Sequence, residues 1–163
     1  MRLHAAALAL LLASCAHTPA RTPHHPEAQL YHAARDATAD VDAALARAAE
    51  RDTRVLLVMG ANWCHDSRAL AGLLETPRFA ALVDARYELV FVNIGMPQTG
   101  DGHNLHIAQR FGLEELPGTP NLLVLTPQGE PVNADTATTW RNAASRSEDA
   151  IYTELSRLAQ EGA

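Results

Sequence analysis

A strand-to-helix passage near the middle of the chain restricts its fold more than any other feature. Residues 55–59 form a short, continuously apolar run, which is typical of a buried strand. Residues 67–74 follow with the spacing of a helix, and one cysteine, Cys64, lies in the connection. At a helix N-terminus, unpaired backbone N–H groups and the helix dipole favour a negative charge. The passage therefore predicts a cysteine whose reactive thiolate form is favoured by its position.

The rest of the chain continues the alternation of helices and strands. Apolar periodicity predicts helices over residues 36–51 and 104–111, a short helix ending near Val83, and a C-terminal helix with a stripe of Ile151, Leu155 and Leu158. Further strands are predicted over residues 87–94 and 121–125, with a hairpin partner near residues 131–133. Either Ser145 or Ser147 can cap the last helix, and Ser145 with Glu148 matches a capping box. This order predicts an α/β fold in which helices flank a small sheet.

The N-terminus has the features of a bacterial lipoprotein signal. Arg2 and His4 precede the apolar residues 5–13, which are too few to span a bilayer as a stable anchor. Residues 12–15, Leu-Ala-Ser-Cys, resemble the lipobox, so we predict that residues 1–14 are a signal peptide and that Cys15 carries lipid. The alternative is an ordinary secretory signal that contains a cysteine. Ala16 in place of Asp implies, by the same resemblance, an outer-membrane lipoprotein that faces the periplasm.

We predict three parts of the chain: the signal peptide, a flexible tether over residues 15–35 that begins with Cys15, and a domain over residues 36–163. The tether is expected because residues 16–30 are rich in proline and histidine. The tether would hold the domain away from the membrane surface.

Charge and cysteine content narrow the function classes. The net charge is −6, all basic residues are arginine, and no arginine-rich run occurs, so nucleic acid is not an expected partner. If Cys15 is lipidated, Cys64 is the only thiol left, and no disulfide can form within the mature chain. Proteins of the oxidising periplasm normally use cysteines in pairs, so intermolecular pairing is the expected purpose of Cys64. A covalent homodimer through Cys64 stays open, and the sequence does not fix the oligomeric state.

Two motifs resemble those of thioredoxin-like proteins. Residues 63–67, Trp-Cys-His-Asp-Ser, stand between a strand and a helix, where these proteins carry their active-site segment. Residues 116–120, Leu-Pro-Gly-Thr-Pro, stand directly before the strand at 121–125, where these proteins carry a cis-proline that faces the active-site cysteine. The resemblance covers roughly residues 36–160 and implies a thioredoxin-like fold with a central mixed β-sheet flanked by helices.

The resemblance also implies roles for individual residues. Cys64 would be the nucleophile, and His65 as a cation would favour its thiolate. Pro120 would be cis and would leave the backbone at Thr119 free to pair with an extended client chain. Trp63 would shape the rim of the site.

Two departures from the thioredoxin pattern remove the parts that resolve an internal disulfide. Ser67 replaces the second cysteine, whose thiol attacks the mixed disulfide and releases the client. Val58 occupies the strand position where many thioredoxins have a buried acid. A serine hydroxyl cannot resolve the mixed disulfide, although Ser67 could donate a hydrogen bond to the Cys64 thiolate.

These features favour a thiol–disulfide oxidoreductase or isomerase that forms mixed disulfides with client proteins or glutathione through Cys64, with no cofactor. One alternative is a non-enzymatic module that binds an extended polypeptide. Another is a copper- or zinc-handling protein in which His103 and His106 join Cys64 and His65, although two solvated histidines are the simpler interpretation and no metal site is predicted. A cysteine peroxidase is less favoured, because no threonine- and arginine-bearing loop surrounds Cys64.

Overall fold

A three-stranded mixed sheet forms the centre of the structure, a computed structural model that describes residues 25–161. The central strand β1 (Arg54–Gly60) runs parallel to β2 (Tyr87–Asn93) and antiparallel to β5 (Asn121–Leu125). The parallel pair is joined by two helices, as a crossover between parallel strands requires. The mixed sheet confirms the predicted α/β architecture with a central mixed sheet.

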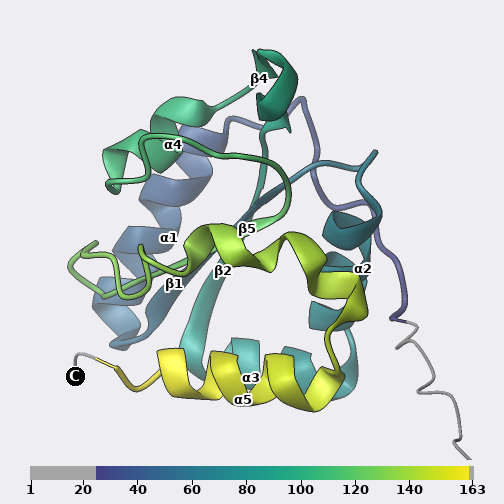
Figure 1. Ribbon diagram of the computed structural model, residues 1–163. Helices are drawn as coiled ribbons and strands as arrows, with labels where there is room; N and C mark the ends of the chain where they lie inside the picture. Colours follow the sequence, from purple (N-terminus) through teal and green to yellow (C-terminus); the bar gives the residue numbers. More distant parts are fainter. Residues whose placement is uncertain (1–24, 162–163) are drawn as a thin grey trace, which may run out of the picture.

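Helices cover both faces of this sheet (Figure 1). The described region contains α1 (Ala37–Arg51), α2 (His65–Leu74), α3 (Pro77–Arg86), α4 (Leu105–Arg110), α5 (Glu148–Leu158), the 3-10 helices η1 (Pro97–Thr99) and η2 (Ala137–Ser145), and a small hairpin of β3 (Gly95–Met96) and β4 (Asp101–Gly102). One face packs against α1 and α4, and the other against α2, α3, η2 and α5. Within residues 25–161, no helix combines the length and the apolar character needed to cross a membrane.

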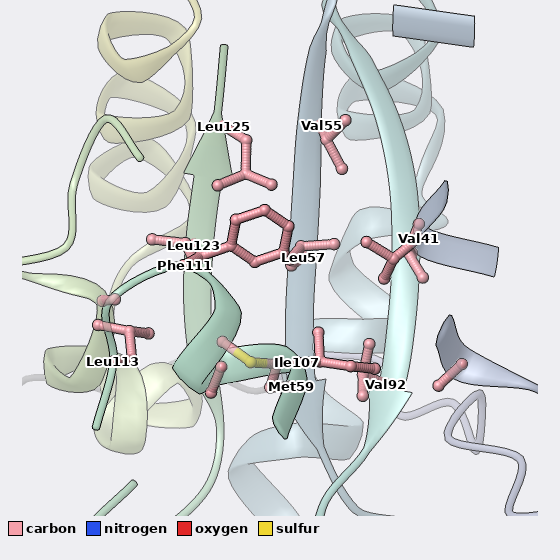
Figure 2. Close-up of a cluster of buried hydrophobic side chains, with 14 of the residues drawn as sticks. Val41, Val55, Leu57, Met59, Val92, Ile107, Phe111, Leu113, Leu123 and Leu125 are labelled. Carbon is pink, nitrogen blue, oxygen red and sulfur yellow. The ribbon is translucent and has the colours of Figure 1, made fainter. Parts of the chain in front are cut away.

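The central strand is buried on both faces, which explains its unbroken apolar sequence. Leu57 and Met59 point toward α1 and α4, where they meet Phe111 and Ile107 (Figure 2). Because successive strand residues alternate between faces, Leu56 contributes to the cluster on the opposite side.

The ends of several elements differ from the prediction. The last helix is capped by Ser147, whose side chain accepts from the Ala150 N–H, so the capping box built on Ser145 is wrong. Ser145 instead ends η2. The hairpin partner of β5 is reduced to one bridge between Leu125 and Pro131.

The structure describes residues 25–35 of the predicted tether, and residues 25–31 of these pack on the domain instead. Tyr31 is only 1% exposed and His25 is buried, with its Nε2 2.7 Å from the Arg146 carbonyl oxygen. Gly72 permits the close approach, because a Cβ there would overlap the backbone of Pro26. We call residues 25–31 the strap. The predicted signal peptide, Cys15 and the remainder of the predicted tether lie outside the described residues.

A carboxylate of the strap fastens it to α2. Glu27 accepts from Arg68 Nε at 2.6 Å and pairs with His65 Nδ1 at 2.8 Å. The hydrogen bond from Arg68, followed by that from His65, holds the pKa of Glu27 below its usual value against the opposing effect of burial. These hydrogen bonds therefore favour the ionised form of Glu27.

Shortening a side chain in the central cluster should destabilise the domain strongly. Leu57→Ala removes fully buried methyl groups from the cluster that also contains Phe111, so we expect the free energy of unfolding to fall by about 2–5 kcal/mol. Denaturant unfolding measures the loss. Leu82→Ala, at a partly buried position beside the other cluster, is the control and should cost clearly less. Equal losses would contradict the placement of Leu57 at the centre of the core.

Removing the charge of Glu27 should weaken the domain in a pH-dependent way. Glu27→Gln is expected to lower the melting temperature at pH values well above 4.5, where the wild-type carboxylate is ionised in both the folded and the unfolded chain. As the pH falls through the lowered pKa of the folded state, the wild type loses this contribution and the two melting temperatures should converge. Thermal unfolding at a series of acidic pH values tests this, with Glu50→Gln on the exposed side of α1 as the control. A difference that stays constant with pH would contradict the expected role of the carboxylate.

Candidate active site

Cys64 is the N-cap residue of α2, at the end of a tight turn that follows β1. Its N–H donates to the Ala61 carbonyl at 3.1 Å, and its carbonyl accepts from the Arg68 N–H at 3.1 Å. The first turn of α2 thus begins immediately after the cysteine, two residues earlier than the sequence predicts. This position places the free N–H groups of the helix next to Cys64, where they favour a negative charge.

The sheet register brings the proline loop to the same place. Because β5 is antiparallel to β1, the start of β5 lies beside the end of β1, and Asn121 pairs with Met59. The Thr119–Pro120 peptide bond directly before β5 is cis, which confirms that prediction. The Cys64 thiol donates to the Thr119 carbonyl oxygen at 3.5 Å, although the two residues are far apart in the sequence. Cys64 is 9% exposed, so the loop covers most of it.

Thr119 offers both kinds of groups that an incoming chain could use. Within residues 25–161 it makes no backbone–backbone hydrogen bond, and its buried Oγ1 has no partner. Its carbonyl is occupied only by the Cys64 thiol. Thr119 and Pro120 therefore lie where the resemblance places them, beside the cysteine.

Ser67 occupies the position of the missing second cysteine, but it does not bond to Cys64. The side chain is fully buried and its Oγ has no hydrogen-bond partner in the described part of the chain. The expected bond from Ser67 to the cysteine is absent because the hydroxyl lies against Gly60, where a Cβ would come within 2.7 Å of it.

The two residues between Cys64 and Ser67 are engaged elsewhere. His65 has a 64% exposed side chain that pairs with Glu27, so a protonated imidazole would share its charge with this carboxylate as well as with the thiolate. Asp66 accepts from the Ala144 N–H at 2.8 Å and so joins α2 to η2.

Trp63, the residue before the cysteine, forms part of the rim of a cleft whose lining does not include Cys64, Thr119 or Pro120. The indole is 50% exposed and donates from Nε1 to the Gly95 carbonyl at 3.0 Å, which fixes the ring against the β3–β4 hairpin. The cleft has a volume of about 660 Å³, and its lining includes Trp63, Met96, Ala33 and His103. Met96 is the second large apolar side chain exposed here.

The histidines proposed for metal binding do not gather around Cys64. His106 Nε2 lies 3.0 Å from Thr38 Oγ1 on α1, whereas His103 lies against Gly95. Among residues 25–161, no three His, Cys, Asp or Glu side chains are grouped so that they could hold a metal ion. The donor set of the metal-handling alternative is therefore not assembled in this structure.

Sequence reasoning missed the contribution of the strap to this site. Tyr31 donates from its hydroxyl to the Ser67 carbonyl at 3.0 Å. The Asn62 side chain forms hydrogen bonds with both the N–H and the carbonyl of Tyr31, each at 3.1 Å. The pair Leu30-Tyr31, apolar and aromatic in a segment otherwise rich in polar and small residues, was the one available signal.

Comparisons with known proteins agree with this fold. Residues 36–127 match the thioredoxin-like family. The structure resembles that of a disulphide isomerase from Xylella fastidiosa Temecula1, with a TM-score of 0.73 and 29% identity over 82% of this chain and 98% of that one. It also resembles a thioredoxin from Thermus thermophilus, with a TM-score of 0.54 and 20% identity over 87% of this chain and 91% of that one, a likeness of fold alone. No curated protein shows significant sequence similarity.

The family match spans the cysteine and the cis-proline, the two features that the structure brings into contact, and the chain belongs to the thioredoxin-like family.

Proposed function

We propose that this chain is a thiol–disulfide oxidoreductase or isomerase that acts through Cys64 alone. The observation that carries the proposal is the contact between the Cys64 thiol and the Thr119 carbonyl at 3.5 Å, at a helix N-terminus and beside a cis-proline. The similarity to a disulphide isomerase supports the same class of reaction.

The proposed reaction needs an external thiol to finish. The Cys64 thiolate attacks one sulfur of a client disulfide, a mixed disulfide forms, and the other client sulfur leaves as a thiolate. A second thiol, from the client or from glutathione, then attacks the mixed disulfide and releases Cys64 as a thiolate. If the client supplies that thiol, its bridges are rearranged without net oxidation. If glutathione supplies it, one client sulfur is left as a thiol and the other is bonded to glutathione, until a second glutathione removes the first as glutathione disulfide and leaves the second client thiol. Ser67 has no thiol and takes no part in these exchanges.

The surroundings of Cys64 suit an extended polypeptide. The Thr119 backbone, which within residues 25–161 bonds only to the Cys64 thiol, can pair with a client strand, as the family resemblance implies. The neighbouring cleft offers Trp63 and Met96 for an apolar side chain close to the client disulfide. The expected clients are therefore partly unfolded proteins that expose apolar residues next to their cysteines.

We place this activity at the cell envelope. The signal-like residues 1–14 and the lipobox-like residues before Cys15 support a lipid anchor, with the domain in the periplasm. The oxidising conditions there would supply the client disulfides.

A second function is favoured by the low exposure of the cysteine. Because Cys64 is only 9% exposed and Ser67 Oγ makes no bond to it, the same surface could hold an extended partner without thiol chemistry. A partner that co-purifies equally with the wild type and with Cys64→Ala would support this binding module.

Replacing the nucleophile should abolish exchange. We expect the wild type to accelerate reduction of a mixed disulfide between a peptide and glutathione by added glutathione, and Cys64→Ser to fall to the uncatalysed rate. Ser67→Ala is the matched control, since it removes a hydroxyl that has no partner, and it should retain most of the activity. A wild type no faster than Cys64→Ser would reject the proposed function.

Restoring the second cysteine should create an internal disulfide. Ser67 lies one turn after Cys64 and is buried, so Ser67→Cys is expected to form a bond with Cys64 under mild oxidation. Titration of free thiols in denaturant would show both lost in the oxidised variant and both regained after reduction. The lipidated wild type, with its single thiol, should show no such internal loss. Thiols that stay free in monomeric Ser67→Cys would contradict the inferred geometry.

A further inference from the structure

We propose that Tyr31 is a positioning residue for Cys64 and that the strap belongs to the reactive site. The proposal rests on the proposed function, because it identifies what holds the nucleophile of that reaction in place. Tyr31 lies far upstream of the cysteine motif, in a segment whose composition is that of a linker.

The Tyr31 side chain contacts the first turn of α2 and holds it in place. It is 1% exposed, and its hydroxyl donates to the Ser67 carbonyl at 3.0 Å. The ring fills the space over Gly60, where a Cβ would come within 2.7 Å of it. A T-shaped contact with Phe91, with ring centroids 5.4 Å apart, fixes the ring from the side of β2. The side chain thus joins the last residue of β1 to the first turn of the helix that Cys64 caps.

The Tyr31 backbone is held by the turn that precedes the cysteine. Asn62 accepts from the Tyr31 N–H through Oδ1 and donates to the Tyr31 carbonyl through Nδ2, both at 3.1 Å. Asn93, at the end of β2, donates to the same carbonyl at 3.3 Å. One residue therefore connects the two strand ends, the turn and the helix that meet at Cys64.

The rest of the strap runs along α2 and strengthens this connection. Ala28 donates from its N–H to the Arg68 carbonyl at 3.0 Å, and Arg68 reaches back to the Asn62 carbonyl at 2.9 Å. Glu27 pairs with Arg68, as described above. These contacts fix the strap to the residues on either side of the cysteine.

The Tyr31 hydroxyl remains a donor at any physiological pH. Burial raises the pKa of Tyr31 far above its usual value, and the nearby charge of Cys64 raises it further. The phenol therefore stays neutral beside the thiolate and keeps its bond to Ser67. Because the N–H groups of α2 stabilise the thiolate only when they point at it, loosening this turn should slow the reactions of Cys64.

The experiment compares two buried tyrosines in the full-length chain. Tyr87 is also buried, and its hydroxyl donates to a carbonyl, that of Leu155, at 2.6 Å. It pairs with Arg54 at the opposite end of β1 from Cys64, so Tyr87→Phe is a matched control for Tyr31→Phe. The measurements are the rate of Cys64 alkylation by iodoacetamide across a range of pH, the rate of exchange with the peptide–glutathione disulfide, and the melting temperature.

Both variants should lower the melting temperature by similar amounts, because each loses one buried hydrogen bond. Only Tyr31→Phe should slow alkylation and exchange at neutral pH, by roughly 3- to 10-fold, and move the rise of alkylation toward higher pH. Asn62→Ala, which releases the Tyr31 backbone, should change alkylation in the same direction. Unchanged alkylation in both Tyr31→Phe and Asn62→Ala, or an equal change in Tyr87→Phe, would overturn the proposal.

The two proposals fail in different ways. Alkylation reports the surroundings of Cys64 and needs no client, whereas exchange requires the proposed function. If Tyr31→Phe slows the alkylation of Cys64 but the wild type does not catalyse exchange, the proposed oxidoreductase is rejected and the positioning role of Tyr31 is supported.

Discussion

The antiparallel pairing of β1 with β5 is the contact on which the candidate site depends. It places the end of β1 beside the start of β5, through Asn121 and Met59, so that the cysteine after one strand meets the proline before the other. The parallel pairing with β2 then brings Asn93 to the same edge, where it bonds to Tyr31. The relative positions of residues in a site at strand ends depend on the register of the sheet. That register is fixed by side chains buried on both faces of β1.

Local patterns predicted the sheet and the outline of the site. The apolar run in β1, the helix after the cysteine and the cis-proline each depend on neighbouring residues or on a recognisable motif, and each is present. The strap was missed because its burial depends on Gly72, whose lack of a side chain makes room for Pro26 far away in the sequence. The hydrogen bond considered from Ser67 to Cys64 was misjudged for the same reason, and the pairing of His65 with Glu27 was missed. Their actual neighbours, Gly60 and Glu27, are set by tertiary packing rather than by the motif.

The interior around the site is consistent with chemistry at a single sulfur. Val58 lies fully buried in the cluster on the α2 face, with Leu70 and Trp140, and offers no carboxylate that could accept a proton from a second thiol. Ser67 is buried on the same side, without a partner for its hydroxyl. Val58 and Ser67 are thus both buried in the packed interior, but neither supplies a group that could open an internal disulfide. In the proposed reaction, the surroundings of Cys64 are then the helix terminus, the proline loop and the strap.

The anchoring of His25 on the domain also sets a distance. If Cys15 carries a lipid, only about ten residues separate the bilayer surface from His25, where the chain is fixed to the end of η2. Even fully stretched, such a segment spans no more than about 35 Å, which is close to the diameter of a small domain. Cys64 would then stay within a short distance of the membrane surface. Its encounters would be restricted to proteins that emerge from, or are themselves attached to, that same surface.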